Sequence, residues 1–210
     1  MGKMKVKGEY DIITGEYPFH KQLKEELVPS LENYTDQQGR RTNVKATMTE
    51  WDWGNDIERV SRLKSFIVEM TRRIVTSPNL SQDLAVRHLW ANIYHHSDYT
   101  NSHDHVGVDI FSFAYFLKTE WYHPPFVFTR SGKKIKSKEG TFIIFPSHLK
   151  HHVPENKSPI KVSHYGGADP IPRPRKRPSV KVPKNLSLNE VNVYEWLHPI
   201  PRPRKRPSIF

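Results

Sequence analysis

Three histidines in two separate segments have the residue type and the spacing of metal ligands. His103 and His105 lie two residues apart in the segment S-H-D-H, and His151 lies in F-P-S-H-L-K-H-H-V-P. Side chains two residues apart in an extended segment share a face, so His103 and His105 can bind one ion, with His151 as a third ligand from a distant strand. Three ligands on one side of a divalent ion leave the opposite positions open to a co-substrate.

Two neighbouring residues are alternatives to this ligand set. Asp104 is a carboxylate, and the usual facial iron site has two His and one carboxylate. As the strand neighbour of His103, however, Asp104 is expected to point away. His152 follows His151, and only one of these two can face a metal for the same reason. The chain contains twelve His, so a surface or packing role for any single one stays open.

The region from about Trp90 to Tyr165 resembles the iron(II)/2-oxoglutarate-dependent oxygenases and is most similar to a group common in tailed-phage genomes. The resemblance covers a little over a third of the chain and depends on an ordered series of residues. These are Trp90, Asn92, Tyr94, His103, His105, Ser112, Tyr115, Leu117, Phe145, Pro146, Ser147, Leu149, His151, Val153, Lys161 and Ser163.

The resemblance implies Fe(II) and 2-oxoglutarate as cofactors, with His103, His105 and His151 as the metal ligands and no further catalytic side chain. It implies that Lys161 pairs with the far carboxylate of 2-oxoglutarate and that Ser163 donates to the same group. Many members have Arg at the first of these positions, and Lys is a less directional partner. Two further positions implied to contact the co-substrate are Tyr94 and Tyr115.

The elements that must position these residues are mainly short strands. A capping-box pattern at Asn55 and Glu58 precedes one amphipathic helix, which Pro78 ends, and a second helix is expected at about 18–31. These signals predict a mainly β sandwich or barrel with flanking helices, which the resemblance narrows to a cupin-like double-stranded β-helix, or jelly roll. The expected strands are 10–14, 44–49, 86–94, 110–117, 126–128, 133–136, 141–145, 149–153 and 160–165.

Three segments are predicted along the chain. Residues 1–83 would form helical and extended support, residues 84–168 the jelly-roll core with the metal site, and residues 169–210 a basic tail. The tail contains PIPRPRKRPS twice, at Pro170–Ser179 and at Pro199–Ser208. Alternating Pro and Arg cannot form a helix and predict polyproline II or a disordered segment. Residues 186–197, between the two copies, are less polar and are predicted to dock as a short helix or strand.

The positive charge is concentrated in this tail. From residue 170 onward ten Lys and Arg face two Glu, which accounts for +8 of the net charge of +11. The asymmetry predicts contact with nucleic acid or with an acidic protein, and so a place in a larger assembly. The cations expected to make this contact are Arg173, Arg175, Lys176, Arg177, Arg202, Arg204, Lys205 and Arg206.

Composition excludes two classes of protein and sets an expected location. Cysteine is absent, so disulfide frameworks and thiolate metal sites are excluded. No apolar run approaches the roughly 18 residues that span a membrane, so no membrane partner is expected. The N-terminus lacks the apolar region of a signal peptide. The expected location is therefore the cytoplasm, of a host cell if the gene is phage-encoded, or a virion.

Three functional hypotheses follow. The first is a non-haem Fe(II)- and 2-oxoglutarate-dependent dioxygenase that hydroxylates a protein or a nucleic-acid-associated substrate. The second is a non-catalytic jelly-roll protein of a virion, whose basic repeats bind nucleic acid or an acidic partner, because a fold does not fix a function. The third is a cupin-like three-His metalloenzyme that does not use 2-oxoglutarate, in which Lys161 would be dispensable.

Overall fold

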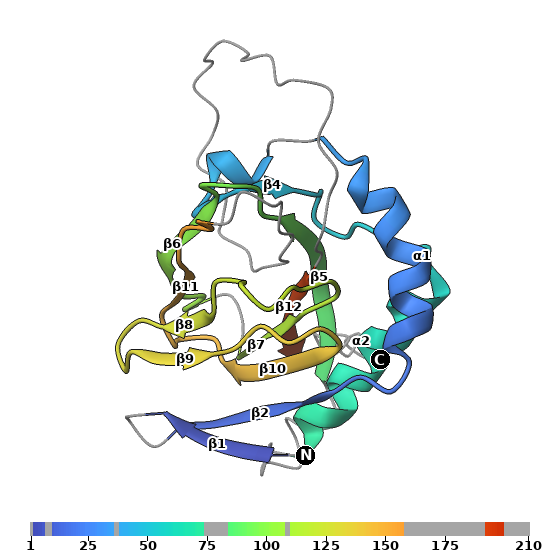
Figure 1. Cartoon of the computed structure of the whole chain (residues 1–210). Helices are drawn as coiled ribbons and strands as arrows, with labels where there is room; N and C mark the ends of the chain where they lie inside the picture. Colours follow the sequence, from blue (N-terminus) through green and yellow to red (C-terminus); the bar gives the residue numbers. More distant parts are fainter. Residues whose placement is uncertain are drawn as a thin grey trace, which may run out of the picture.

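Two antiparallel β-sheets face each other in the computed structural model, and two helices lie outside the larger sheet (Figure 1). The structure describes residues 2–6, 10–35, 38–73, 84–107, 110–157 and 192–199. The larger sheet has the strand order β1-β2-β10-β7-β12-β5-β4, and the smaller sheet has the order β3-β6-β11-β8-β9. Within the described residues, no helix is long and apolar enough to cross a membrane.

The strands of the larger sheet come from the whole length of the chain. They are β1 (Gly2–Val6), β2 (Tyr10–Glu16), β4 (Thr47–Met48), β5 (Leu84–Ile93), β7 (Phe111–Tyr115), β10 (Thr141–Pro146) and β12 (Asn192–Pro199). The strands of the smaller sheet are β3 (Val44–Lys45), β6 (Tyr99–His103), β8 (Phe126–Phe128), β9 (Lys133–Ile135) and β11 (His151–Val153). Most of these strands begin and end within a few residues of the predicted bounds. The prediction missed β1 and β6, and the predicted strand 44–49 is divided into β3 and β4, which lie in different sheets.

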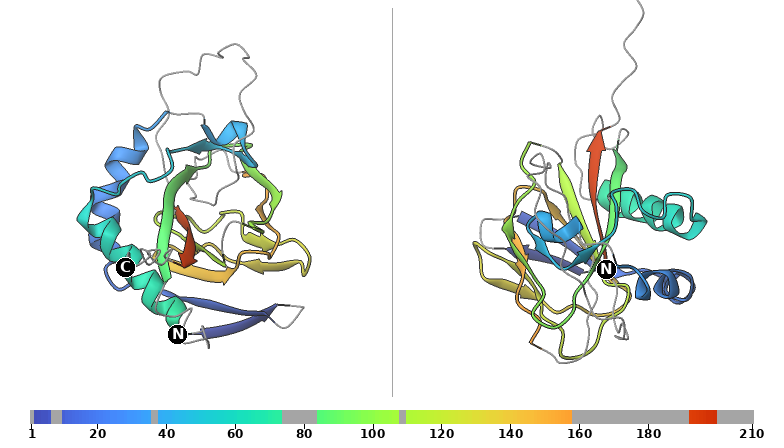
Figure 2. Two further views of the ribbon diagram at one scale, coloured as in Figure 1. Left: turned by 180° about the vertical axis from the view of Figure 1, so that it is seen from behind. Right: turned by 90° about the horizontal axis from the view of Figure 1, so that it is seen from above.

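The chain alternates between the two sheets from β5 onward, and this alternation defines the fold. Strands β5, β7, β10 and β12 lie in the larger sheet, whereas β6, β8, β9 and β11 lie in the smaller one. All pairings are antiparallel. This is the double-stranded β-helix, or jelly roll, so the predicted fold class is confirmed. Figure 2 shows the two sheets from behind and from above.

Strand β12 overlaps residues 186–197 of the expected basic tail, which the sequence predicts to dock as a short helix or strand. It pairs with β5 on one side and with β7 on the other, so a strand from the expected basic tail lies inside the larger sheet. Strands β1 and β2, from the expected N-terminal support, extend the same sheet beside β10. The sheet thus takes strands from all three predicted segments, because strand pairing depends on contacts distant in sequence.

Two amphipathic helices cover the outer face of the larger sheet (Figures 1 and 2). Helix α1 (His20–Glu32) buries Leu23, Leu27 and Leu31, which recur at steps of four residues. Helix α2 (Glu58–Arg72) buries a stripe of the same kind. Its buried residues are Val60, Leu63, Ile67, Val68, Met70 and Thr71.

The predicted capping box of α2 is wrong. The helix begins at Glu58, with Ile57 at the N-cap and no side-chain cap hydrogen bond. The Asn55 side chain, which lies before the helix, instead accepts a hydrogen bond from Lys64 Nζ at 2.6 Å. A turn that includes Gly54, with a φ of 77°, precedes the helix. The helix therefore starts two residues beyond the position that the capping-box pattern favours.

The strand register assigns the two faces of the larger sheet. Phe142 and Tyr115 are directly opposed, and the Phe142 ring packs edge-on against Phe66 of α2 with 5.4 Å between centroids. This face is therefore covered by the helices. Phe145, three residues along β10, points the opposite way and lies 4.9 Å from the ring of His151 in the smaller sheet. That second face looks into the space between the sheets.

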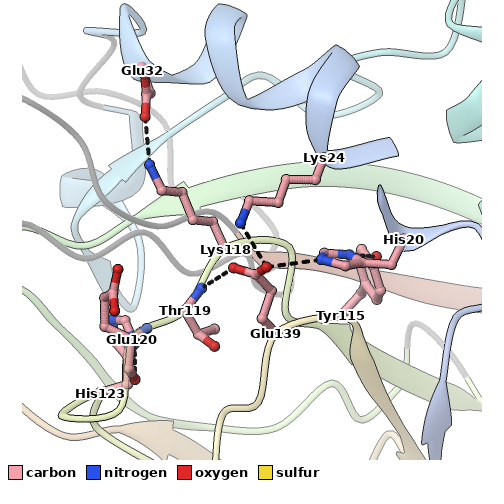
Figure 3. A network of polar contacts seen from close by, with 9 residues as sticks. All are labelled: His20, Lys24, Glu32, Tyr115, Lys118, Thr119, Glu120, His123 and Glu139. Atoms are coloured by element: carbon pink, nitrogen blue, oxygen red, sulfur yellow. Dashed lines mark hydrogen bonds and ion pairs between the residues drawn. The ribbon is translucent and has the colours of Figure 1, made fainter. Parts of the chain in front are cut away.

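A polar network fixes α1 to the loops at one end of the larger sheet (Figure 3). The Glu139 carboxylate, in the turn before β10, accepts hydrogen bonds from Lys24 Nζ at 2.7 Å and from His20 Nε2 at 3.2 Å. The Tyr115 hydroxyl pairs with His20 Nδ1 at 2.6 Å. Since Nε2 donates to the carboxylate, Nδ1 of a neutral His20 accepts from the Tyr115 hydroxyl.

Candidate metal centre

His103 and His151 come together because two strands end at the same place. His103 is the last residue of β6 and His151 the first of β11, and the two are directly opposed in the ladder. His105 lies just beyond β6, where its backbone N–H donates to the Ser147 carbonyl at 2.8 Å. The three imidazoles form a group whose ligand nitrogens all lie within 4.8 Å of one another.

Backbone carbonyls set the orientation of two of these rings. Nδ1 of His103 bonds to the carbonyl of Asn101 at 2.8 Å, and Nδ1 of His151 bonds to the carbonyl of Leu149 at 2.9 Å. A carbonyl only accepts, so each Nδ1 carries the proton and each Nε2 presents a lone pair. Metal-binding histidines are commonly held by a hydrogen bond of this kind from the ring nitrogen that does not ligate.

The nitrogens that remain are suited to a cation. Nε2 of His103 is buried and has no hydrogen-bond partner among the described residues. Nε2 of His105 and Nε2 of His151 lie 3.2 Å apart. Two imidazole nitrogens that each lie about 2.1 Å from one ion are separated by about 3 Å, so this spacing fits a shared metal. A metal ion would also give the Nε2 atom of His103 the partner that it lacks.

Burial keeps two of the three imidazoles neutral. His103, His105 and His151 are only 7%, 2% and 3% exposed. Burial lowers the pKa of His103 to about 4, and it lowers the pKa of His151 well below its ordinary value. At neutral pH these two rings are therefore unprotonated, which is the form that ligates a metal.

Aromatic rings form the wall behind the cluster. Phe126 of β8 stacks on His151, with 5.1 Å between centroids and 16° between planes, and Phe145 contacts the same ring from the larger sheet. Sequence reasoning did not include these two residues in the site. Their signal is the strand alternation, which places every second residue of β8 and β10 on the inner face.

The two alternative ligands point away from the cluster. The Asp104 carboxylate lies 3.9 Å from Lys150 Nζ, and it is not part of the three-His group. The His152 ring is half-buried, and its Nδ1 pairs with Thr129 Oγ1 at 2.9 Å. The preference for His151 over His152 and for three imidazoles over Asp104 agrees with this geometry.

The structure separates the two tyrosines predicted to contact a co-substrate. Tyr94 is buried and its hydroxyl bonds to Thr100 of β6, so it reaches across the space between the sheets. Tyr115 lies on the opposite face, where its hydroxyl bonds to His20 of α1. The structure therefore does not bring Tyr115 to the His cluster, because its position on β7 alternates with the inward-facing Ser112.

The remaining predicted binding residues lie outside the described residues. These include Lys161 and Ser163, the predicted strand 160–165, and both copies of the repeat apart from Pro199. The tail cations expected to contact a polyanion lie outside them too: Arg173, Arg175, Lys176, Arg177, Arg202, Arg204, Lys205 and Arg206.

The fold and the cluster together define a jelly-roll protein with a three-His group able to hold a metal ion. No family model matches the sequence, and no curated protein matches it. Solved structures do resemble it. A prolyl-4-hydroxylase from Pseudomonas putida is similar with a TM-score of 0.62 and 12% identity, over 90% of this chain and 93% of that chain.

Two further structures support the same fold. The viral collagen prolyl hydroxylase of Paramecium Bursaria Chlorella virus-1, solved as a 2OG complex, has a TM-score of 0.51 and 12% identity, over 90% of this chain and 96% of that chain. EctD from S. alaskensis, solved with bound Fe, has a TM-score of 0.53 and 13% identity, over 93% of this chain and 77% of that chain. At these identities the similarity establishes the fold.

Proposed function

We propose that this chain is an Fe(II)- and 2-oxoglutarate-dependent dioxygenase that hydroxylates a protein or a nucleic-acid-associated substrate. The observation that carries the proposal is the convergence of three buried imidazoles inside the jelly roll, two of them held by backbone carbonyls with Nε2 directed inward. The similar fold of the iron-bound EctD and of two prolyl hydroxylases supports it.

In this proposal His103, His105 and His151 hold the iron. With 2-oxoglutarate and dioxygen, the bound iron supplies the oxidising power to hydroxylate an unactivated C–H bond. The protein holds the metal ligands in position and keeps water from one side of the cluster, where Phe126 and Phe145 pack against His151. Three neutral ligands leave the iron one positive unit higher than two His and a carboxylate would, which favours binding of an anionic co-substrate.

Lys161 and Ser163 are the proposed partners of the far carboxylate of 2-oxoglutarate, and Tyr94 is a third. Tyr94 is suited to contact the co-substrate because its buried hydroxyl lies between the sheets. Burial raises the pKa of Tyr94, so its hydroxyl stays protonated and can donate to a carboxylate. Tyr115 takes no part in the proposal.

The test is an anaerobic titration of the full chain with ferrous iron and then with 2-oxoglutarate. The chelated complex of these three components is expected to give a weak visible charge-transfer band. We expect the band to disappear in His103→Ala, to weaken in Lys161→Ala and to persist in His152→Ala, the matched control whose ring faces outward. Succinate release under air then screens candidate substrates.

The third imidazole favours a second candidate, a three-His metalloenzyme that does not use 2-oxoglutarate. Ferrous iron would then bind with the same dependence on His103, but 2-oxoglutarate would give no band and Lys161→Ala would bind iron as the unmodified chain does. Absence of any metal binding would contradict both enzyme proposals and would favour a non-catalytic jelly-roll protein that acts through its basic tail.

A further inference from the structure

The hairpin formed by β8 and β9 is strongly basic. Its connecting turn ends at Gly132, whose φ of 66° allows the tight reversal. Four exposed cations on and after this turn have no acidic partner among the described residues. They are Arg130, Lys133, Lys134 and Lys136.

This lack of partners contrasts with other cations of the folded body. Several of those lie 2.7 Å from a carboxylate: Lys24 with Glu139, Arg59 with Glu26, and Lys118 with Glu32. Lysines on an edge strand commonly prevent sheets from pairing edge to edge, and β9 is an edge strand. That role accounts for the lysines of β9 but not for Arg130, which lies in the turn.

The hairpin begins beside the candidate metal centre. One cross-strand row of the smaller sheet joins His103, His151, Phe128 and Lys133 in that order. Directly opposed residues share a face, so Lys133 lies on the face that carries the His cluster, and Lys134 lies on the outer face. Neighbouring strands are about 4.8 Å apart, which places the Cα atom of Lys133 about 10 Å from that of His151.

A groove runs along the outer face of the same sheet towards this hairpin. It has a volume of about 360 Å³ and is lined by residues of β6, β11 and the hairpin turn, and by Pro154 and Glu155 after β11. At one end lies Tyr99, which is 39% exposed. At the other end Ser102 Oγ pairs with Thr129 Oγ1 at 2.7 Å, and Thr129 immediately precedes Arg130.

We propose that this groove and the basic hairpin form a docking surface for single-stranded nucleic acid, with the groove on the outer face of the smaller sheet and Lys133 on the face that carries the candidate metal centre. Unpaired cations would bind the phosphates, and the exposed Tyr99 ring offers a base a stacking surface, which is the combination that single-strand binding surfaces use. The surface rests on the proposed function and deepens it, because it selects a nucleic-acid strand as the substrate or as the carrier of the substrate.

An acidic peptide fits these features less well than nucleic acid does. Carboxylates would satisfy the hairpin cations, but acidic side chains do not stack on an aromatic ring such as Tyr99, whereas nucleic-acid bases do. The hydroxyls of Ser102 and Thr129 and the ring of His152 add donors and acceptors along the groove. Base edges carry donors as well as acceptors, whereas phosphates and carboxylates only accept.

The test is fluorescence anisotropy of the metal-free full chain with a fluorescein-labelled single-stranded oligonucleotide of about 12 nucleotides. A hairpin variant carries Arg130→Ser, Lys133→Ser and Lys134→Ser. We expect its affinity to fall by about tenfold or more at low salt. The slope of the logarithm of the binding constant against the logarithm of the salt concentration should decrease in magnitude by about 2, or roughly 0.7 for each phosphate that is no longer neutralised. Tyr99→Ala is expected to weaken binding about fivefold or more.

A matched control removes the same charge from the helices. Lys21→Ser, Arg62→Ser and Arg72→Ser change exposed cations of α1 and α2 and leave the basic tail in place. We expect this control to bind like the unmodified chain. Equal decreases in affinity in the two triple variants would show that only net charge matters and would overturn the proposal, as would unchanged binding of the hairpin variant.

Two more outcomes would overturn the choice of nucleic acid. One is unchanged affinity in Tyr99→Ala, and the other is an acidic peptide of similar charge that binds as tightly and is weakened as much in the hairpin variant. Folding of each variant is checked by thermal unfolding. Because these measurements need neither metal nor turnover, a negative result here is distinct from a missing charge-transfer band, which tests the proposed function itself.

Discussion

His103 and His151 are directly opposed across the ladder between β6 and β11, and their ring centroids lie 4.4 Å apart. The ladder is irregular immediately beyond this pair, where Val153 aligns with Thr100. The extra residue in β6 lets both His103 and Thr100 face the space between the sheets. The register of one short strand pair therefore sets the distance between two candidate ligands.

Metal affinity should depend on which of two adjacent histidines is changed. His151→Ala removes a buried imidazole of the cluster and is expected to weaken binding of ferrous iron more than about 100-fold, since removing even a residue that only orients a ligand costs roughly 10- to 100-fold. His152→Ala removes a ring on the outer face and should leave the affinity unchanged. Anaerobic calorimetry measures both. Similar decreases in the two variants would contradict the assignment of His151.

The free energy of unfolding should depend on pH through Glu139. Half-burial opposes ionisation of this carboxyl, but hydrogen bonds from His20 and Lys24 outweigh it and lower the pKa to about 2. The ionised carboxylate therefore stabilises the fold above the unfolded-state pKa of about 4.3, and this contribution disappears as the pH falls through about 2. We expect Tm to decrease over that interval.

The variant Glu139→Gln isolates this contribution. At neutral pH it should lower the free energy of unfolding by about 2 kcal/mol, because the variant cannot form the charged hydrogen bonds to Lys24 and His20. Its Tm should also change less than that of the unmodified chain between about pH 5 and about pH 2.5. Glu25→Gln, which changes an exposed carboxylate of α1, is the control and should keep the original pH profile.

The packing of α2 against the larger sheet should be sensitive to one ring. Phe142 is 1% exposed and contacts Phe66 of α2. Phe142→Ala is expected to lower the free energy of unfolding by about 3–5 kcal/mol, as other large-to-small changes in cores do. Trp121 is 81% exposed, so Trp121→Ala should change stability by less than about 0.5 kcal/mol. Urea denaturation followed by circular dichroism compares the two.

Truncation should distinguish strand β12 from the residues that follow it. Removing residues 192–210 deletes a strand that pairs with both β5 and β7, and it would expose two unpaired strand edges inside the larger sheet. We expect that chain to aggregate or to unfold well below the original Tm. Removing residues 201–210 keeps β12 and should leave Tm nearly unchanged. If both truncated chains unfolded alike, β12 would not be the strand that completes the sheet.

Local patterns in the sequence determined much of the architecture. Runs of β-branched and aromatic residues between turns placed β5, β8 and β10, and the steps of three and four residues placed both helices, because these signals depend only on neighbours along the chain. Strand alternation turned Asp104 away from His103 and allowed only one of His151 and His152 to ligate, and the resemblance to the oxygenases selected His151. The three-His group could therefore be predicted before any contact was known.

Tertiary structure decided what no local pattern contains. Strand β12 pairs with β5 and β7, although other β-rich segments of the chain could have taken that position in the sheet. Tyr115 matches an oxygenase motif, yet the register of β7 turns it towards His20. The sequence gives no sign that Lys133 differs from any other solvent-exposed lysine. Only the cross-strand pairing through β8 and β11 places it on the same face as the histidines. Pairing between distant strands fixes each of these positions, since the free energy of a strand depends on its neighbours more than on its own residues.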